Sequence, residues 1–328
     1  MNQNENDHNQ PGRGGAPNEA VPPEFLKALE SYAEAVNADD REKADEAALK
    51  TFIMAAQQAM AHPTPELELA EQADRCLRAG DWAGAEDAYR KVLAIQQQTG
   101  NPGLAAKPRM DLSGLFRLLG RLDEAREMAR AATESARKSE LYPLIAMALR
   151  NEVGCALAQG RTDEALAAAS EALRVIHPGK MAALMRALAH TDRAECLLAK
   201  GQLEAADQDL RAGWDILGSG SLSRIGTGPV VALAKWCEVQ AQLQVRKGNL
   251  EEAVVSLQKA IEHRRGGVDR SCDPSPFAFA ALARDFERLA EIRKQMGDPP
   301  GQEQALVEAN ETWKKVRLPA DAGSTPGR

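Results

Sequence analysis

Aromatic residues are scarce in this chain of 328 residues, and it has neither a long apolar run nor an excess of positive charge. Phe, Trp and Tyr together make up 4% of the sequence, and the apolar residues are rich in alanine, which suits many thin contacts between helices better than one thick globular core. No stretch reaches about 18 consecutive apolar residues, so the sequence predicts no membrane span and no signal peptide. The net charge of −7 argues against nucleic acid as a partner, because binding phosphates requires a basic surface.

Motifs that carry catalysis or bind metals are also missing. The five cysteines include no C-x-x-C pair, the five histidines show no H-E-x-x-H spacing, and no serine lies in a G-x-S-x-G sequence. A glycine-rich segment at 218–223 has neither the strand before it nor the lysine after it that a phosphate-binding loop requires. We therefore expect no enzyme activity, catalytic residue, cofactor or metal. We predict that the cysteines are small buried hydrophobic residues in a reducing compartment and that the protein is cytoplasmic.

The chain does contain an internal repeat, in which a glycine is followed five residues later by an alanine. Successive glycines are 40, 40, 41 and 47 residues apart. A repeat of this length is typical of stacked helix pairs. The five pairs are Gly80/Ala85, Gly120/Ala125, Gly160/Ala165, Gly201/Ala206 and Gly248/Ala253.

Each glycine stands where one helix should end and the next should begin. Glycine adopts the left-handed backbone of a helix end without the steric penalty of a Cβ atom. Cations precede it and acidic residues follow it, as with Lys200 and Glu204 around Gly201, which matches the helix dipoles. Apolar residues recur two and nine positions later, as expected for a helix that buries one face. Small residues recur seven positions earlier, at Ala73, Ser113, Val153, Ala194 and Ala241, with Ala290 before Gly297 as a sixth.

The segments GDWAGA, GRLDEA, GRTDEA, GQLEAA and GNLEEA resemble the central turn of tetratricopeptide repeats, and the resemblance covers roughly residues 63 to 317. The units are longer than the usual length of about 34 residues, and this longer unit is similar to the repeats of kinesin light chains and of bacterial tetratricopeptide signalling regulators. The resemblance implies a scaffold, an adaptor or a co-chaperone. Co-chaperones of this family that grip a carboxylate carry asparagine on the inward face. The matching positions here lie six before each glycine, and none of them is asparagine. They hold Asp74, Gly114, Gly154, Glu195 and Gln242.

We predict an all-α fold, a right-handed α-solenoid of about six stacked helical hairpins preceded by an N-terminal helical hairpin. The last unit, after Gly297, departs from the pattern and is expected to cap the C-terminal end. The expected helices span residues 64–79, 82–98, 103–119, 122–139, 141–159, 162–176, 180–200, 203–217, 229–247, 250–265, 275–296 and 300–315.

The sequence divides into four parts. Residues 1–22 and 318–328 are polar and rich in Gly and Pro, so both are predicted to be disordered tails. Residues 23–62 show two helical patterns without the glycine turn, and residues 63–317 form the repeat region. The N-terminal hairpin either caps the solenoid or forms a homodimer through the apolar segment at 52–54.

These features indicate a protein that binds other proteins. We predict a non-enzymatic scaffold or adaptor that holds a peptide or helix of a partner protein in the concave groove lined by the first helix of each hairpin. The alternative is a regulatory subunit of a signalling or transcription complex that senses a peptide or ligand, with a partner supplying the DNA-binding or enzymatic domain. Protein is thus the expected partner, and nucleic acid and membrane are not.

Inward positions counted back from the glycines predict a basic centre between acidic flanks. Lys107, Arg117 and Arg150 form the centre, and Glu195 and Glu238 belong to the flanks. Arg117 and Arg150 would supply forked donors to the carboxylates of a partner segment with a central acidic stretch. The alternative is that all five are solvated or internally paired charges on an exposed helix face.

Two long connections interrupt the regular spacing, at residues 218–229 and 266–276. Both join a second helix to the next first helix, so in a solenoid they should emerge on the same edge, with Arg224 near Arg270. They form either a second binding edge or insertions without a role, since surface loops tolerate added length.

Overall fold

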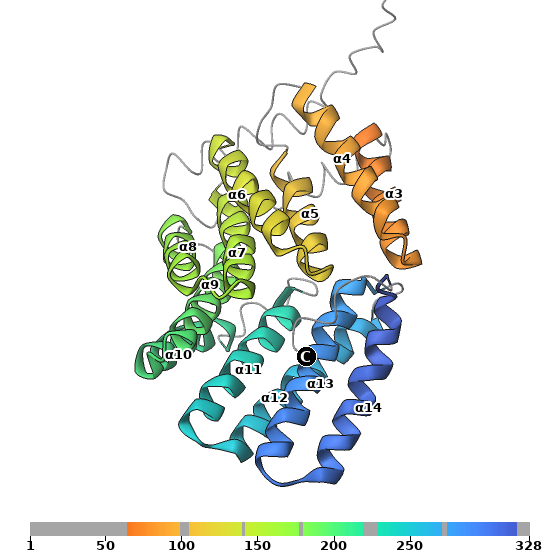
Figure 1. The fold of residues 1–328 in the computed structure, drawn as a ribbon. Helices are drawn as coiled ribbons and strands as arrows, with labels where there is room; N and C mark the ends of the chain where they lie inside the picture. Colours follow the sequence, from red (N-terminus) through yellow and green to blue (C-terminus); the bar gives the residue numbers. More distant parts are fainter. Residues whose placement is uncertain are drawn as a thin grey trace, which may run out of the picture. The chain divides into compact units, whose positions relative to one another are not determined.

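The computed structural model describes residues 64–98, 105–139, 142–176, 180–218, 228–270 and 274–319, all within one compact unit that spans residues 62–328. These described residues form twelve helices and their connections, and none of them is in a strand (Figure 1). The helices are α3 (Pro65–Ala79), α4 (Trp82–Gln98), α5 (Ala106–Leu118), α6 (Leu122–Lys138), α7 (Tyr142–Ala158), α8 (Thr162–Val175), α9 (Lys180–Ala199), α10 (Leu203–Leu217), α11 (Gly228–Lys247), α12 (Leu250–Arg270), α13 (Pro276–Gln295) and α14 (Pro299–Val316). The predicted N-terminal tail and N-terminal hairpin lie outside the described residues.

Consecutive helices pair into six hairpins, from α3–α4 to α13–α14, and each hairpin packs on the next one along the chain. The predicted all-α fold of stacked hairpins is confirmed. Every predicted helix end agrees with the structure within three residues, except one. No helix in the described part of the chain is both long and apolar enough to cross a membrane.

The exception is the end of α12, which continues to Arg270 instead of stopping at residue 265. The sequence analysis placed Gly266 and Gly267 in a loop because each glycine costs a helix about 1 kcal/mol. Arg264 and Arg265 hold the preceding turn by ion pairs to Asp285 of α13 and to Glu308 of α14, respectively. These tertiary contacts favour the helix over its intrinsic propensity, and the second long connection is therefore shorter than predicted.

The six turns that close the hairpins share one geometry. All six repeat glycines, Gly297 included, have positive φ angles between 70° and 80°. At Gly120 the glycine amide donates to the carbonyl of Arg117 at 3.3 Å, and the next amide, of Arg121, donates to the carbonyl of Phe116 at 2.8 Å. This bonding pattern satisfies the last carbonyls of the first helix and reverses the chain within two residues. The predicted left-handed glycine turn is confirmed in every repeat.

Small side chains let the two helices of each hairpin approach closely. Ser113 illustrates the contact, because its hydroxyl donates to the carbonyl of Ala125 at 2.8 Å and lies 3.1 Å from the sulfur of Cys155 in the next repeat. The equivalent positions are buried in the first five repeats, which confirms the pattern of small residues there. They are Ala73 and Ala85, Ser113 and Ala125, Val153 and Ala165, Ala194 and Ala206, and Ala241 and Ala253.

The cysteines behave as buried apolar residues wherever the structure describes them. Cys155, Cys196 and Cys237 are buried, Cys76 is partly buried, and all four are free thiols. Burial raises the pKa of Cys196 to about 12 and that of Cys237 to about 11, so both are protonated at neutral pH. Cys272 lies outside the described residues.

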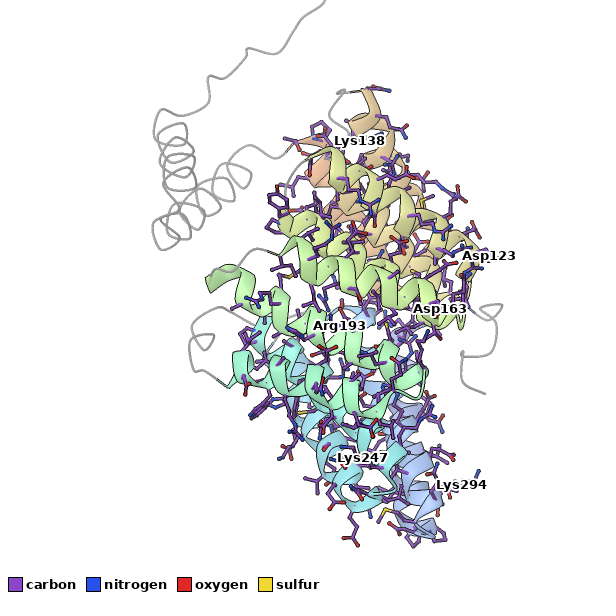
Figure 2. All side chains as sticks on the ribbon, turned by 90° about the vertical axis from the view of Figure 1, so that its left-hand side faces the viewer. Asp123, Lys138, Asp163, Arg193, Lys247 and Lys294 are labelled. Atoms are coloured by element: carbon purple, nitrogen blue, oxygen red, sulfur yellow. The ribbon has the colours of Figure 1, made fainter. Side chains whose placement is uncertain are left out.

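Polar contacts join successive glycine turns along one edge of the stack. The side chain of Gln159 donates to Asp123 at 2.9 Å, Lys200 pairs with Asp163, and Lys247 lies 3.3 Å from Asp207. Figure 2 shows the labelled Asp123 and Asp163 on adjacent turns. Each contact links a residue just before one glycine to an acidic side chain just after the preceding glycine, so it helps to set the stacking of neighbouring hairpins.

The last hairpin packs against the first. The indole nitrogen of Trp82, at the start of α4, donates to the carbonyl of Arg317 at 2.8 Å, and Val316 lies in the same apolar cluster as Ala73 and Leu77. Figure 1 shows the C-terminal end of α14 returning to the end of α3. Leu318, which the sequence analysis assigned to the C-terminal tail, packs against this cluster. The two ends of the hairpin array therefore meet.

We predict that Ala165→Leu destabilises the protein by about 1 to 3 kcal/mol, because Ala165 is fully buried and a larger side chain would overpack its hairpin. Ala167→Leu, on an exposed position of the same helix, is the matched control and should change stability by less than about 0.5 kcal/mol. Urea unfolding followed by circular dichroism measures both. Equal effects of the two substitutions would contradict the packing described here.

Candidate protein-interaction surface

The first helices of consecutive repeats carry charged side chains toward one another. We call the surface that these side chains form the first-helix face. It comprises Arg117 of α5, Arg150 and Asn151 of α7, Asp192 and Glu195 of α9, Lys235 and Glu238 of α11, and Arg284, Asp285 and Arg288 of α13.

Ion pairs cross from helix to helix along this face. The Nε of Arg150 lies 2.5 Å from a carboxylate oxygen of Asp192, which joins α7 to α9. The ammonium of Lys235 lies 2.9 Å from Glu195 of α9 and 3.2 Å from Glu238 of its own helix α11. Side chains from three consecutive repeats therefore form one connected strip of alternating charge.

The strip ends in a buried cluster around Glu238. The Glu238 carboxylate, 4% exposed, contacts Lys235 and Arg264 and lies 2.6 Å from Arg288. Burial raises the pKa of Glu238, but the three cations outweigh it and hold that pKa well below the usual range. Asp285 is fully buried and accepts from Arg264 at 2.5 Å, and burial raises its pKa despite this partner. The ion pairs of this cluster connect α11, α12 and α13.

The structure gives four of the five groove residues predicted from the sequence an intramolecular partner. Lys107 pairs with Asp111 on its own helix at 2.5 Å, while Arg150, Glu195 and Glu238 pair across helices as described. The acidic flank residues thus have cations beside them, and charge alternates from helix to helix. A role of these residues in partner binding stays a prediction.

Arg117 differs from the other four. Among the residues that the structure describes, no carboxylate lies within 4.0 Å of its guanidinium. The guanidinium lies over Gly154 of α7, where a Cβ atom would come within 2.6 Å of one of its terminal nitrogens. A glycine at this position therefore makes room for the arginine of the preceding repeat.

The residues predicted to mark a second binding edge are not placed by the structure. Arg224 lies outside the described residues, and of Arg270 only the helical backbone is described. The proximity of these two side chains stays a prediction.

Sequence reasoning missed the partners of the groove residues. Asp192 and Arg288 share a repeat position but Lys235 does not, and each of the three pairs with a residue more than 40 positions away or with its own helix. A usable signal was present at the position nine before each glycine, which holds a polar residue in five of the six repeats. Those residues are Glu71, Asp111, Asn151, Asp192 and Arg288.

A second charged cluster ties α9 to α10. Asp209, 4% exposed, accepts from Nε and a terminal nitrogen of Arg193, both at 2.6 Å, and lies 2.9 Å from Nδ1 of His190. Figure 2 labels Arg193 beside α10. Burial raises the pKa of Asp209, but its bonds from Arg193 and His190 outweigh burial and lower it. The carboxylate is therefore ionised and structural.

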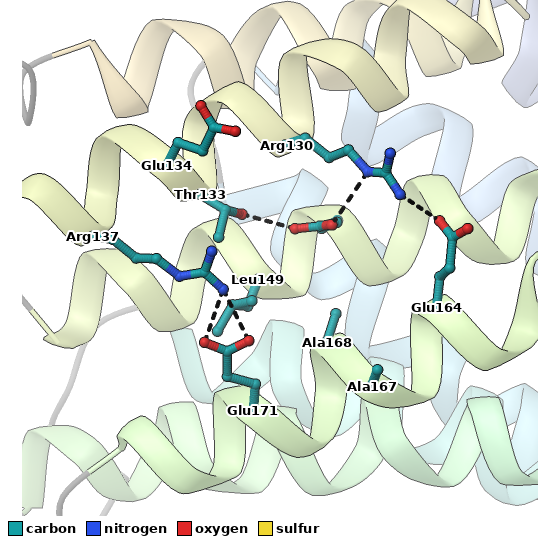
Figure 3. Close-up of a pocket in the computed structure, with 10 residues that line it drawn as sticks. Arg130, Thr133, Glu134, Arg137, Leu149, Glu164, Ala167, Ala168 and Glu171 are labelled. Carbon is teal, nitrogen blue, oxygen red and sulfur yellow. Dashed lines mark hydrogen bonds and ion pairs between the residues drawn. The ribbon is translucent and has the colours of Figure 1, made fainter.

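A shallow pocket of about 350 Å³ lies between α6, α7 and α8 (Figure 3). Its charged side chains pair with one another: Arg130 with Glu164 at 2.8 Å and Arg137 with Glu171 at 2.9 Å. A hydrogen bond from Arg161, together with nearby Arg126 and Arg130, lowers the pKa of Glu164 to about 2. These contacts tie the second helices of two repeats together. The described residues contain no cluster of three or more His, Cys, Asp or Glu side chains placed to hold a metal ion.

Residues 67–138, which span α3 to α6, match the tetratricopeptide repeat family. The same glycine turn then recurs in all six hairpins, and the pair of buried small residues recurs in the first five. The chain contains tetratricopeptide repeats. The sequence-based assignment to this family is confirmed.

Several solved structures are similar to this tetratricopeptide-repeat protein. BtubC (BKLC) from P. vanneervenii is 16% identical, with 79% of this chain and 94% of that chain covered and a TM-score of 0.45. A Rap protein complexed with competence and sporulation factor is 12% identical, with 89% and 98% covered and a TM-score of 0.47. The apo form of the quorum sensor NprR from B. thuringiensis is 14% identical, with 88% and 87% covered and a TM-score of 0.46. No curated protein sequence matches the chain.

We predict that Glu238→Gln destabilises the protein by roughly 3 to 5 kcal/mol, because it leaves three cations around a buried site without their shared anion. Glu308→Gln, which removes the carboxylate of a more exposed pair with Arg265, should cost less than about 1 kcal/mol. Chemical unfolding measures both. A loss at Glu238 as small as that at Glu308 would show that the cluster adds nothing to the fold.

A pH dependence follows from Asp209. Because its pKa is lowered in the folded state, its contribution to stability is complete above the unfolded pKa of about 3.9 and is lost as the pH falls below that value. The difference in unfolding free energy between the wild type and Asp209→Asn should therefore be largest near pH 5 and shrink toward pH 2. Urea titrations at several pH values test this, and a constant difference would refute it.

Proposed function

We propose that this tetratricopeptide-repeat protein is a non-enzymatic scaffold or adaptor that binds a peptide or helix of a partner protein along the first-helix face. Five of the six repeats contribute their first helix to this face, so a bound segment would contact several repeats at once. Protein binding is the general function of this repeat family, and the ion pairs that connect α7, α9, α11 and α13 support a role for this face.

The observation that carries the proposal is the state of Arg150. Only its Nε bonds to Asp192, and its terminal nitrogens have no hydrogen-bond partner among the described residues. The bond to Asp192 holds the guanidinium in place while its two outer donors remain available. An arginine held in this way can donate hydrogen bonds to a carboxylate with little loss of side-chain entropy.

Arg150 is also flanked by residues that a ligand could contact. Met147, one turn earlier on α7, is 42% exposed and occupies the same repeat position as Lys235. An exposed methionine beside fixed charges suits contact with a partner segment that carries both apolar and acidic side chains. The acidic part of this chemistry agrees with the central acidic stretch predicted for the partner from the sequence, and the apolar part is added by Met147.

Site-specific cross-linking tests the proposal. A photoreactive residue at Met147, on the first-helix face, should capture a partner segment in cells, whereas the same residue at Ala167, exposed on α8, should not. Arg117→Glu with Arg150→Glu should lower the partner affinity more than tenfold. Replacing Arg150 also removes its ion pair with Asp192, so the double variant could lose stability for that reason alone. Arg117→Glu by itself breaks no ion pair among the described residues and is therefore the control for stability.

Equal cross-linking from both positions, or unchanged affinity in the folded double variant, would show that the partner binds elsewhere. Loss of binding together with unfolding in the double variant, but unchanged binding in Arg117→Glu, would assign these charges to the fold alone. Circular dichroism of each variant separates these outcomes.

A further inference from the structure

Two arginines on the first-helix face lack the ion pairs that their neighbours have. Arg117 of α5 and Arg284 of α13 are both half-buried, and no carboxylate among the described residues lies within 4.0 Å of either guanidinium. The Arg284 guanidinium stacks 5.7 Å from the ring centroid of Trp313 instead. Next to them, Arg150 and Arg288 both have carboxylate partners. The missing anion is therefore a local feature.

A contact between the second and the last hairpin places these two arginines on facing helices. A Cβ atom on Gly114 of α5 would lie 3.7 Å from the ring of Phe277 of α13, so the two helices touch there. Arg117 follows Gly114 by three residues and Arg284 follows Phe277 by seven, which places both on the contacting faces. Burial lowers the pKa of Arg284, and the positive charges of Arg117 and Arg288 lower it further.

A third donor without a partner lies on α7, the helix that Arg117 contacts at Gly154. The side-chain nitrogen Nδ2 of Asn151 is buried and makes no hydrogen bond. Asn151 precedes Gly154 by three residues, so it lies on the same face of α7 as the glycine that Arg117 covers. A buried donor left unsatisfied costs free energy, and a bound acceptor would remove that cost.

We propose that Arg117, Arg284 and Asn151 form an anion site that binds a carboxylate of the partner segment. The proposal rests on the proposed function, because it names the chemistry that one part of the first-helix face recognises. Phe277 and the ring of Trp313 provide apolar contacts next to the three donors. The site combines helices from the second, third and sixth hairpins, so it exists only when the ends of the array meet.

The local charge favours a carboxylate over a phosphate. The two arginines contribute two positive charges, and Glu287, which accepts from the indole of Trp313 at 2.8 Å, partly offsets the charge of Arg284. About one positive charge is left over, which a single carboxylate neutralises. A doubly charged phosphate would leave an excess negative charge near Glu287 and Glu238.

Thermal unfolding separates this site from a structural role. Arg117→Gln removes no ion pair and relieves the repulsion with Arg284, so the melting temperature should stay within about 2 °C of the wild type or rise. Arg130→Gln, on the outer surface, removes bonds to Glu152 and Glu164 and should not raise it. A drop of more than about 4 °C in Arg117→Gln would assign that arginine to the fold and overturn the proposal.

Selection from a random peptide library displayed on phage tests the ligand chemistry with the whole chain. Peptides selected on the wild type should contain Asp or Glu at one recurring position. Each selected peptide is then made in three forms, with the acidic residue, with its amide, and with phosphoserine. On the wild type, the acidic form should bind about tenfold more tightly than the amide form.

The double variant Arg117→Gln with Arg284→Gln should bind the acidic and amide forms equally, whereas Arg130→Gln should discriminate as the wild type does. Selected peptides that cross-link to a photoreactive residue at position 147, but bind equally well with the acidic residue or its amide, would overturn the anion site and leave the proposed function intact. Tighter binding of the phosphoserine form would refute the choice of carboxylate. A library that yields no peptide bound at the first-helix face would count against both the site and the proposed function.

Discussion

The left-handed glycine turn is the constraint on which the rest of the structure depends. At each of the six turns a positive φ angle lets the chain reverse within two residues, and after the first five a buried alanine five residues later lets the second helix lie close to the first. Such small side chains keep the two helices of a hairpin close together. The first helices of the second to fifth hairpins pack on one another in turn, so their side chains meet.

Close contact between the first helices requires that the charged side chains between them be paired. A charge between two packed helices is partly removed from water, so it needs a partner within reach. Arg150 with Asp192 and Lys235 with Glu195 satisfy this requirement across consecutive repeats, and Glu238 is surrounded by cations from three helices. Such pairs add little net stability compared with apolar packing, but they penalise any other register of the stack, because a shift would leave a buried charge alone.

Local features of the sequence were sufficient to predict the helices but not the contacts between distant repeats. Turn glycines, buried alanines and helix ends follow from short-range rules that each repeat obeys by itself, and the structure confirms them. The end of α12 was wrong because ion pairs from Arg264 and Arg265 extend a helix that its glycines disfavour. The bond from Trp82 to Arg317 spans 235 positions in the sequence, and no repeat pattern indicates which end meets which. Counting within repeats identified Arg117 and Arg150, whereas their surroundings depend on how the hairpins stack.

The meeting of the two ends explains why the unpaired arginines lie where they do. Between consecutive repeats the same kind of packing recurs, and there the sequence supplies carboxylates for the cations. The contact between α5 and α13 joins hairpins that are not neighbours in the sequence, so it has a composition of its own. At this contact Arg284 stacks on an aromatic ring and Arg117 covers a glycine, and both arrangements place a guanidinium without neutralising it. Two like charges and an unsatisfied amide cost free energy in the free protein. A carboxylate bound between them would offset that cost, so the binding energy of the ligand and the closure of the array would depend on each other.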